Sequence, residues 1–263
     1  MELSILLVNY NQKYFSRLCI ESIQKSVVNF EYEIIVCDNN STDESVEYLK
    51  EAHAHGIIKL IQPLKNLGFG KANNIAAKMA KGKYLLILNT DITVESDTIF
   101  KMIDYMKEHK DIGILGPKLV YHNGDIQPSC RRNFKFLDLF VKRTFLKKIW
   151  SFKKRYTNYL MTDFNHKSVQ EVDLITGAFM LMRRDLFDDV HGFDERYFLF
   201  MEDFDLCKKV KLKGFKIVYF PEVFAVHYHK RLSDGGLSRL VFNKISWIHL
   251  ISAAKYFWKW RKG

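Results

Sequence analysis

Short apolar runs alternate with amphipathic segments along the first part of the chain. The apolar runs, rich in leucine and β-branched residues, lie at 3–9, 33–37, 57–61, 83–88 and 112–120. Between them, apolar positions recur at helical spacing over 14–28, 43–54, 71–80 and 96–109. Short buried strands that alternate with helices in this way are typical of an α/β fold built on a parallel sheet.

The rest of the chain has a less regular pattern. An apolar segment at 172–180 precedes a helix that begins with Glu202, and runs at 215–220 and 223–229 predict a last pair of strands. Apolar residues then recur at helical spacing from 237 to 260. These changes divide the chain into residues 1–120, residues 121–230 with a basic insert at 131–167, and residues 231–263 with a basic amphipathic C-terminal helix.

The composition is that of a folded protein with a large core. Of the 263 residues, 48% are apolar and only 4 are proline, which excludes collagen-like and low-complexity chains. No uncharged apolar run reaches the roughly 18 to 20 residues that span a bilayer, and the N-terminus lacks the basic start of a signal peptide. The 4 cysteines form no Cys-x-x-Cys motif, so we expect neither disulfides nor a zinc site, and a cytoplasmic location.

Basic residues are concentrated in two segments. Residues 131–167 hold 11 basic and 2 acidic residues, and residues 230–263 hold 8 basic and 1 acidic. Two basic segments on an otherwise mildly acidic chain indicate docking to a phosphate-rich surface, either an anionic membrane or RNA. A solvated, solubilising surface explains the same charges without any partner.

Carboxylates follow two of the predicted strands. Asp38 comes directly after the second strand, and Asp91 lies a few residues beyond the fourth. In open α/β sheets, ligands bind beyond the carboxyl ends of the parallel strands. We therefore expect the loops after the first four strands to converge on one crevice.

Several motifs, taken in order, carry a resemblance to a known family. They are Asp38-Asn39-Asn40, Gly-Phe-Gly-x-x-Asn-Asn at 68–74, Asn89-Thr90-Asp91, Thr176-Gly177-Ala178, Glu202-Asp203 and His227. Over roughly residues 2–230, the chain resembles the family 2 glycosyltransferases of GT-A fold and, within them, the rhamnosyltransferase-like members. The resemblance implies a Rossmann-like nucleotide-binding half with a mixed sheet, and transfer of a sugar from a nucleotide sugar with inversion at the anomeric carbon.

The resemblance places the donor site in the first half of the chain. Asp38 matches the family position that accepts a hydrogen bond from the pyrimidine base, and Asn40 would support its loop. The other donor-binding residues that it implies are Asn66, Gly70, Lys71, Asn73 and Asn89. Turn and helix-cap chemistry explains the asparagines and glycines equally well without a ligand, so both interpretations stay open.

A divalent cation, Mg²⁺ or Mn²⁺, is implied by the same resemblance. Asp91 stands where the family has the last acid of its Asp-x-Asp motif, but Asn89 replaces the first acid. The family often has a histidine at the position of His227, which would compensate for Asn89. His229, on the same face of the strand, is interpreted as an ordinary strand residue. The alternative role for Asp91 is to cap the following helix.

In the family, the aspartate of the Glu-Asp pair is the general base, and Asp203 occupies that position. Glu202 would orient the acceptor or Asp203, and Thr176-Gly177-Ala178 resembles the family's acceptor-side strand. Inversion by direct displacement needs one carboxylate within hydrogen-bond reach of the acceptor hydroxyl. Acidic residues at a helix start are also favoured by the helix dipole, without any role in catalysis.

The resemblance implies an inverting, metal-assisted glycosyltransferase that moves a sugar, with rhamnose favoured, from a dTDP- or UDP-sugar, and together with the basic segments it predicts a lipid-linked or growing cell-surface polysaccharide as the acceptor. A nucleotidyltransferase acting on sugar phosphates is the first alternative, but it would carry a glycine-rich basic loop where this chain has Val8 to Gln12. A non-enzymatic RNA-binding protein is the second. No zinc-finger, RRM or KH signature is visible, so we expect no nucleic acid partner.

The C-terminal segment combines apolar helical spacing with basic residues and a cluster of Phe257, Trp258 and Trp260. This composition predicts a helix in an anionic membrane interface, which would place the protein peripherally on the cytoplasmic face of the cell membrane. Packing of the helix on its own domain, or on a second subunit in a homo-oligomer, is the alternative.

Overall fold

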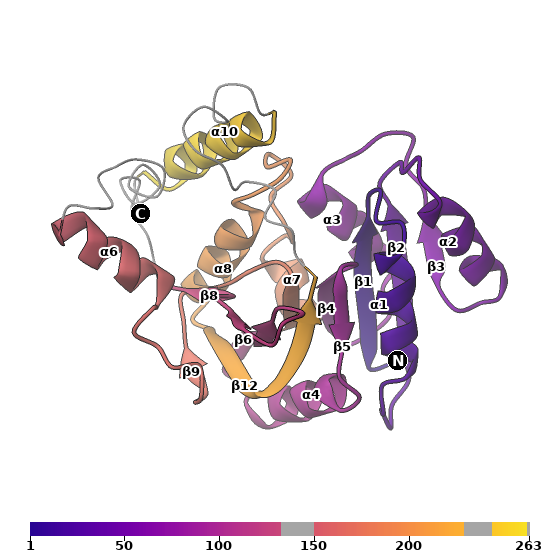
Figure 1. Ribbon diagram of the computed structural model, residues 1–263, viewed down its shortest axis with the longest axis horizontal. Helices are drawn as coiled ribbons and strands as arrows, with labels where there is room; N and C mark the ends of the chain where they lie inside the picture. Colours follow the sequence, from indigo (N-terminus) through magenta and orange to yellow (C-terminus); the bar gives the residue numbers. More distant parts are fainter. Residues whose placement is uncertain (133–149, 229–243, 262–263) are drawn as a thin grey trace.

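The computed structural model describes residues 1–132, 150–228 and 244–261, which form an α/β architecture around one large sheet (Figure 1). The strands are β1 (Leu3–Asn9), β2 (Tyr32–Asp38), β3 (Lys59–Ile61), β4 (Tyr84–Asn89), β5 (Ile92–Val94), β6 (Ile112–Val120), β7 (Ile126–Gln127), β8 (Cys130–Arg131), β9 (Gln170–Glu171), β10 (Leu174–Ile175), β11 (Phe179–Arg183) and β12 (Lys216–His227). The helices are α1 (Phe15–Gln24), α2 (Ser45–Ala54), α3 (Phe69–Met79), α4 (Thr98–Glu108), α6 (Trp150–Leu160), α7 (Arg184–Asp189), α8 (Glu202–Leu212) and α10 (Lys244–Lys259).

The large sheet has the strand order β3-β2-β1-β4-β11-β6-β12-β5, with β7 added to β6 and β9 to β12. β3, β2, β1 and β4 are parallel, as the alternation of strands and helices predicts. β11 then runs antiparallel between β4 and β6. Strands from both halves of the chain therefore form one continuous mixed sheet.

Helices cover both faces of the sheet because side chains alternate along each strand. In β1, Ile5 and Leu7 belong to a core shared with α1, α2 and α4. Leu6 points to the other face and belongs to a core shared with α3, α7 and α8. All three side chains are fully buried. The two cores run along the strands and leave the strand ends to polar residues.

The last strand differs from the sequence prediction. Instead of two strands at 215–220 and 223–229, β12 is a single strand of 12 residues that runs beside β6. A register shift between Phe220 and Phe224 accommodates Pro221, which has no N–H to donate to the ladder. The proline therefore bends the strand without ending it. His229 lies outside the described residues.

Two short features near the strand ends also depart from the sequence prediction. β5, which the pattern does not predict, follows Asp91 and pairs antiparallel with β12, so that Ile92 lies opposite His227. Thr176-Gly177-Ala178, expected in a strand, instead connects β10 to β11. Both features lie where the predicted site residues gather.

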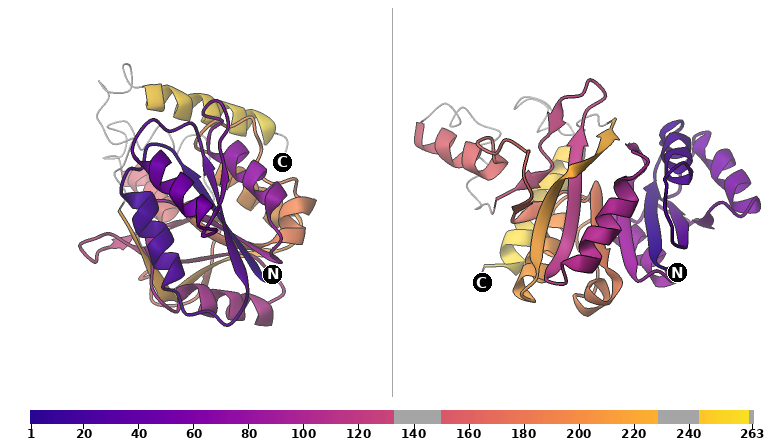
Figure 2. Two further views of the ribbon diagram at one scale, coloured as in Figure 1. Left: turned by 90° about the vertical axis from the view of Figure 1, so that its right-hand side faces the viewer. Right: turned by 90° about the horizontal axis from the view of Figure 1, so that it is seen from below.

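α10 packs on the outer side of α8, away from the large sheet (Figures 1 and 2). Its Ala253 and Tyr256 are buried in a cluster with Tyr197 and Met201. The rings of Tyr256 and Phe204 meet edge to face at 6.3 Å. Packing of the helix on its own domain is therefore confirmed for this face of α10. Within the described residues, no helix combines the length and the apolar character needed to cross a bilayer.

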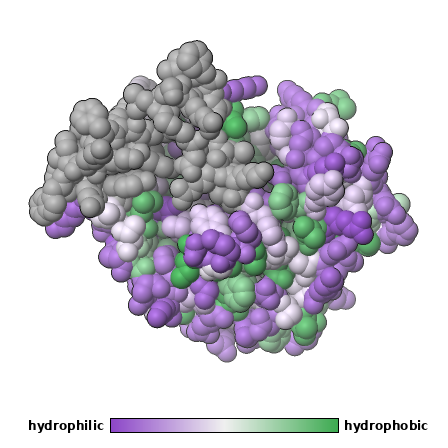
Figure 3. Space-filling view, in the orientation of Figure 1, coloured by the Kyte–Doolittle hydropathy of each residue, from purple (hydrophilic) through white to green (hydrophobic). Residues whose placement is uncertain are grey.

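The surface seen in Figure 3 is mainly hydrophilic, with apolar residues in small groups. Some charges pair locally, such as Arg132 with Asp163 at 2.9 Å and Lys213 with Asp189 at 2.7 Å. Ion pairs this exposed are screened by water and contribute little to stability. Stability therefore depends mainly on the two cores.

Candidate active site

The carboxylate of Asp38 is held at the end of β2 by a buried hydrogen-bond network. Asn9 lies opposite Asp38 in the parallel pairing of β1 with β2, and its Nδ2 donates to Asp38 Oδ1 at 3.0 Å. Gln62, directly after β3, donates to Asp38 Oδ2 at 3.2 Å. The ends of the first three strands thus come together, in agreement with part of the expected convergence of four loops, and fix one buried acceptor group at the edge of the sheet.

Asn39, the neighbour of Asn40, joins this edge of the sheet to the loop before α3, residues 66–68. The buried Asn39 donates from Nδ2 to Asn66 Oδ1 at 2.9 Å, and its Oδ1 accepts from the N–H of Leu67 at 2.8 Å. Asn66 Oδ1 also accepts from the N–H of Gly68 at 2.9 Å. Asn40 is exposed and has a φ of 64°. Asn66 is therefore part of the network, whereas Asn40 lies at the surface of the turn.

Two glycines let the start of α3 approach the segment before α8. Gly68 has a φ of 83°, and a Cβ there would lie 2.1 Å from the carbonyl oxygen of Phe198, so that only glycine fits. The N–H of Phe69 donates to the same oxygen at 3.0 Å. A Cβ on Gly70 would lie 3.0 Å from the Cβ of Phe193. Packing of α3 thus requires small residues here, in addition to any role in ligand binding.

The polar residues of α3 have different surroundings. Lys71 forms an exposed ion pair with Glu195 at 3.0 Å. Asn73 is buried and donates from Nδ2 to a carbonyl one turn earlier in α3, at 3.0 Å. Asn74 brackets the backbone of Phe193, donating to its carbonyl at 2.8 Å and accepting from its N–H at 2.9 Å. Asn74 therefore joins α3 to the segment before α8, whereas Asn73 bonds within α3 and Lys71 remains accessible.

Asp91 and His227 come together at the pairing of β5 with β12. Asp91 Oδ1 lies 3.2 Å from His227 Nε2, and both side chains are largely buried. The other ring nitrogen, Nδ1, lies 2.8 Å from Oε1 of Gln127 in β7. In the tautomer in which Nδ1 donates to this amide oxygen, the Nε2 lone pair faces the carboxylate, which is the arrangement that binds metal ions.

This arrangement fits a divalent cation held partly by the protein. An oxygen and a nitrogen 3.2 Å apart are close enough to bind one ion with bonds of about 2.1 Å. Asn89, at the end of β4 and opposite Val8 of β1, adds an amide at the same end of the sheet. Among the described residues, no group of three or more His, Cys, Asp or Glu side chains forms a complete metal site. Phosphate oxygens and water would supply the remaining ligands.

Asp203 lies at the start of α8, beside the turn between β10 and β11. Its carboxylate accepts a hydrogen bond from the N–H of Gly177 at 3.1 Å and another from the N–H of Phe204 at 2.9 Å. The same turn bonds to the end of β4, where the N–H of Asn89 donates to the carbonyl of Ala178 at 2.9 Å. One turn therefore connects the candidate base to the Asn89-Thr90-Asp91 motif.

Glu202, next to Asp203, is the more deeply buried of the two carboxyl groups. Burial and the neighbouring charge of Asp203 raise the pKa of Glu202 to about 8. Burial also raises the pKa of Asp203, but the N–H groups of Gly177 and Phe204 favour its ionised form. At neutral pH, Glu202 is therefore the protonated member of the pair, and Asp203 is the member that accepts a proton.

The backbone directly before Glu202 is strained. Phe200 and Met201 have φ angles of 68° and 71°, in the left-handed region that residues other than glycine rarely adopt. Such conformations cost about 1 to 3 kcal/mol each and persist only where surrounding contacts hold them. Strain of this kind clusters at functional sites, which agrees with a catalytic role for the start of α8.

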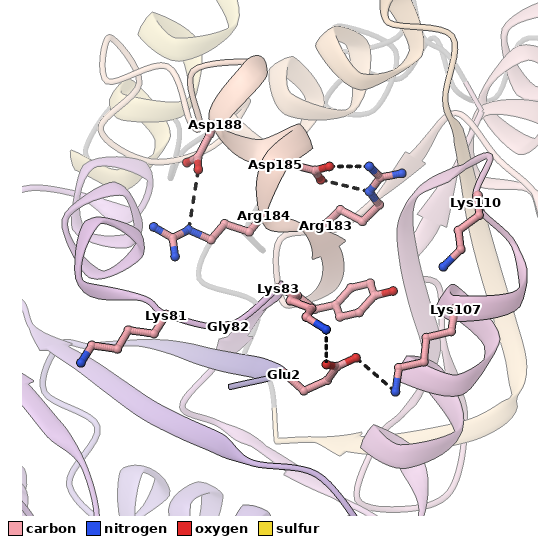
Figure 4. Close-up of a pocket in the computed structure, with 11 residues that line it drawn as sticks. Glu2, Lys81, Gly82, Lys83, Lys107, Lys110, Arg183, Arg184, Asp185 and Asp188 are labelled. Carbon is pink, nitrogen blue, oxygen red and sulfur yellow. Dashed lines mark hydrogen bonds and ion pairs between the residues drawn. The ribbon is translucent and has the colours of Figure 1, made fainter.

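The large cavity of Figure 4 lies at the other end of the sheet, since Glu2 and Lys83 precede β1 and β4. It has a volume of 810 Å³ and is lined by Glu2, Lys81, Gly82, Lys83, Tyr84, Lys107, Lys110, Arg183, Arg184, Asp185 and Asp188. Its charges pair with one another, as Glu2 does with Lys83 at 3.4 Å and with Lys107 at 3.1 Å. None of the predicted site residues lines it, so it is separate from the candidate active site.

Four residues that build the site are missed by sequence reasoning: Asn9, Asn39, Gln62 and Gln127. Asn9 and Gln62 lie at the ends of apolar strand runs, and this is the same signal that identifies Asp38. Asn39 is the residue directly after Asp38. Gln127 lies in a strand of two residues outside every motif, and no sequence signal identifies it.

The sequence of this chain is similar to those of known proteins. The family model described as Glycosyl transferase family 2 matches residues 4–190. N-acetylglucosaminyl-diphospho-decaprenol L-rhamnosyltransferase of Mycobacterium tuberculosis (H37Rv) is 25% identical over 239 residues, which cover 86% of this chain and 76% of that protein. Rhamnosyltransferase WbbL of Escherichia coli K12 is 27% identical over 261 residues, which cover 96% of this chain and 91% of that protein.

Solved structures share the fold. TarS 1-349 of S. aureus in complex with UDP matches with a TM-score of 0.60 and 20% identity, over 86% of this chain and 60% of that one. GalNAc-T7 with UDP, GalNAc and Mn²⁺ matches with a TM-score of 0.67 and 17% identity, over 89% of this chain and 45% of that one. This chain thus spans less than two thirds of these solved chains. The likeness confirms the predicted GT-A fold.

Proposed function

The chain belongs to glycosyl transferase family 2, and we propose that it transfers a sugar, with rhamnose favoured, from a dTDP- or UDP-sugar to a lipid-linked or growing cell-surface polysaccharide. Two relatives named as rhamnosyltransferases support the choice of sugar. The name of one, which places its acceptor sugar on diphospho-decaprenol, supports a lipid-linked acceptor. The family match decides against the two alternatives, a nucleotidyltransferase and a non-enzymatic RNA-binding protein.

The donor nucleotide lies over the carboxyl ends of the parallel strands. Asp38 accepts a hydrogen bond from the imide N–H of the pyrimidine, because Asn9 and Gln62 orient its two oxygens and each oxygen keeps a further lone pair. Asn66 fixes the loop beside the ribose, and Lys71 approaches the phosphates from the first turn of α3. The remaining donor-site residues, Asn40, Gly70, Asn73 and Asn89, shape the loops and the helix around the nucleotide.

Asp91 and His227 would hold a divalent cation, which would neutralise the charge that develops on the departing nucleoside diphosphate. Gln127 fixes the orientation of the His227 ring through Nδ1, so that Nε2 faces Asp91. Asn89 contributes no charge, so a single carboxylate has to attract the cation. We therefore expect weak metal binding by the free protein and tighter binding when donor phosphates complete the set of ligands.

Asp203 takes the proton of the acceptor hydroxyl as the hydroxyl oxygen attacks the anomeric carbon. The bond from that carbon to the diphosphate oxygen breaks on the opposite face, which inverts the configuration. Glu202 remains protonated and therefore adds no second negative charge beside the nucleophile. One carboxylate is sufficient, and no enzyme nucleophile is required.

The outer face of α10 rests on an anionic membrane surface at the cytoplasmic side. Ile251 and Trp258 lie two turns apart on this helix, and their side chains are 51% and 69% exposed. The guanidinium of Arg261 lies 3.7 Å from the centre of the Trp258 ring. Exposed aromatic and aliphatic side chains next to cations are typical of helices in the membrane interface. A lipid-linked acceptor would be presented at the same surface.

The position of Asp203 carries the proposed function, because Gly177 holds its carboxylate at 3.1 Å in the turn that also bonds to Asn89. The test is a panel of dTDP-, UDP- and GDP-sugars incubated with a polyprenyl-diphosphate-linked sugar, in Mn²⁺ or in chelator, with the product configuration read by NMR. We expect metal-dependent transfer from a pyrimidine donor with inversion. Transfer with retention, or from GDP-sugars alone, would overturn the proposal.

A further inference from the structure

One buried carboxylate of α8 takes no part in the proposed chemistry. Asp205, two residues after Asp203, is fully buried. Lys259 Nζ lies 2.7 Å from its Oδ1 and 2.8 Å from its Oδ2, and Trp260 Nε1 donates to Oδ1 at 2.9 Å. Lys209 and the hydroxyl of Tyr197 are more distant, at 3.7 and 3.5 Å. The charge inside α8 is therefore balanced chiefly from the end of α10.

α10 also binds the segment that leads into α8. Lys259 Nζ donates to Asp194 Oδ2 at 2.7 Å, Lys255 Nζ donates to the carbonyl of Arg196 at 2.8 Å, and Ser252 Oγ donates to the carbonyl of Leu199 at 2.9 Å. These three donors lie on successive turns of the helix. Residues 194–201 are thus fixed along α10 up to the two left-handed residues that precede Glu202.

The opposite side of the same segment contacts the start of α3, at Gly68 and Phe69. The carbonyl oxygen of Phe198 accepts a hydrogen bond from the N–H of Phe69 at 3.0 Å. The same oxygen lies so close to Gly68 that a side chain at position 68 would not fit. Residues 194–201 are therefore held between α10 on one side and the start of α3 on the other. A displacement of α10 would remove contacts from the strained backbone, and from the first turn of α8 at the same time.

From this arrangement we infer that Lys259 and Trp260 are positioning residues for the glycosyl transfer. They act through Asp205 and residues 194–201 to hold Asp203 in place. The inference rests on the proposed function, since it takes Asp203 as the base. It assigns the C-terminal helix to the active site as a support, in addition to its contact with a membrane.

The test compares Lys259→Met with Lys259→Arg. Methionine keeps much of the aliphatic stem but leaves the Asp205 carboxylate buried without its main cation. We expect kcat to fall roughly 10- to 100-fold, since small misplacements of a reacting group have effects of this size, and arginine to restore most of it. Lys213→Met is the matched control, because it removes an exposed ion pair at the far end of α8, and its kcat should equal that of the wild type.

Assays are run at a temperature at which circular dichroism shows the variants to be folded. Under this condition, a residue with a merely structural role would lower the melting temperature but leave kcat unchanged. If Lys259→Met does not fold, Trp260→Phe keeps a six-membered aromatic ring but removes the N–H that donates to Asp205, and it should still lower kcat. A folded Lys259→Met or Trp260→Phe with wild-type kcat, while Asp203→Asn is inactive, would overturn the inference alone. Wild-type transfer by Asp203→Asn would instead overturn the assignment of the base.

Discussion

The Nε2 atom of His227 lies 3.2 Å from Oδ1 of Asp91. The contact exists because β5 runs antiparallel to the end of β12, a pairing that joins distant parts of the chain. The helix-cap alternative for Asp91 is wrong, since the N-cap of α4 is Asp97. A carboxylate and an imidazole that face each other across 3.2 Å, with Gln127 on the second ring nitrogen, instead form a pair suited to a divalent cation.

Replacement of Asp91 tests this pair directly. We expect Asp91→Ala to lose the metal-dependent part of nucleoside diphosphate binding, because the only carboxylate proposed to hold the cation is removed. Calorimetry with UDP and dTDP, in Mn²⁺ and in chelator, measures that difference. Asp97→Ala, which changes an exposed aspartate before α4, is the control. Equal metal dependence in Asp91→Ala and the wild type would show that the cation binds elsewhere.

Gln127 offers a second and independent test of the metal pair. Loss of an outer-shell partner typically weakens metal binding by about 10- to 100-fold. We expect this loss for Gln127→Ala, whereas Gln127→Glu keeps an oxygen acceptor for Nδ1 and should bind Mn²⁺ at least as well as the wild type. Mn²⁺ titration in the presence of UDP, followed by electron paramagnetic resonance, measures the affinity. Unchanged affinity in Gln127→Ala would mean that the ring of His227 needs no such partner.

The first half of the chain is predictable from sequence because its elements are local. Strands predicted at 3–9 and 112–120 have the bounds observed for β1 and β6. Each strand and helix carries its own periodicity there. The second half depends on pairing between distant segments. The insertion of β11 between β4 and β6, and the passage of β12 through Pro221, have no local signature.

The residues of the candidate site also divide into those with a local sequence signal and those placed only by tertiary contacts. Asp38 and Asp91 are predicted because polar residues beyond strand ends gather at one edge of an α/β sheet. The partner of His227 is not predicted, since Gln127 is placed by a two-residue strand whose register with β6 is a tertiary property. The support that α10 gives to Asp205 is equally hidden, because Lys259 and Trp260 read in sequence as a basic, aromatic tail.

The proposed base gives the largest expected effect on catalysis. Asp203→Asn keeps the shape of the side chain and removes the basic oxygen, so turnover should fall by roughly two to four orders of magnitude while nucleotide binding persists. Initial-rate transfer assays and UDP calorimetry separate the two quantities. Asp189→Asn changes an exposed aspartate of α7 and should leave both unchanged. Near-normal turnover in Asp203→Asn would make Glu202 the next candidate.

The buried acid Glu202 makes stability depend on pH. Its pKa is about 8 in the folded protein and near 4.5 when the chain unfolds, so the folded state binds more protons between these values. The stabilisation from this group is therefore complete below about pH 4.5 and is lost as the pH rises toward 8. We expect the free energy of unfolding of the wild type to fall relative to Glu202→Gln over this range. Parallel pH profiles of the two proteins in urea titrations would contradict the assignment.

Two faces of α10 have different surroundings. Ala253 and Tyr256 are buried on the domain, whereas Leu250, Ile251 and Trp258 are 38%, 51% and 69% exposed. An apolar row of this kind on a helix that is otherwise docked indicates a second contact. The membrane is the contact that we propose, and a second subunit is the alternative.

Substitutions on the exposed face separate these two contacts without disturbing the docked one. We expect Ile251→Ser with Trp258→Ser to abolish co-sedimentation with vesicles that contain anionic phospholipid, because burial of these side chains in the interface drives binding. Transfer to a lipid-linked acceptor in those vesicles should slow, while hydrolysis of the donor in solution persists. Leu212→Ser, which changes a 68% exposed leucine at the end of α8, is the matched control. Wild-type vesicle binding by the double variant would exclude this face as the membrane contact, and a loss of dimers on light scattering would assign it to a second subunit.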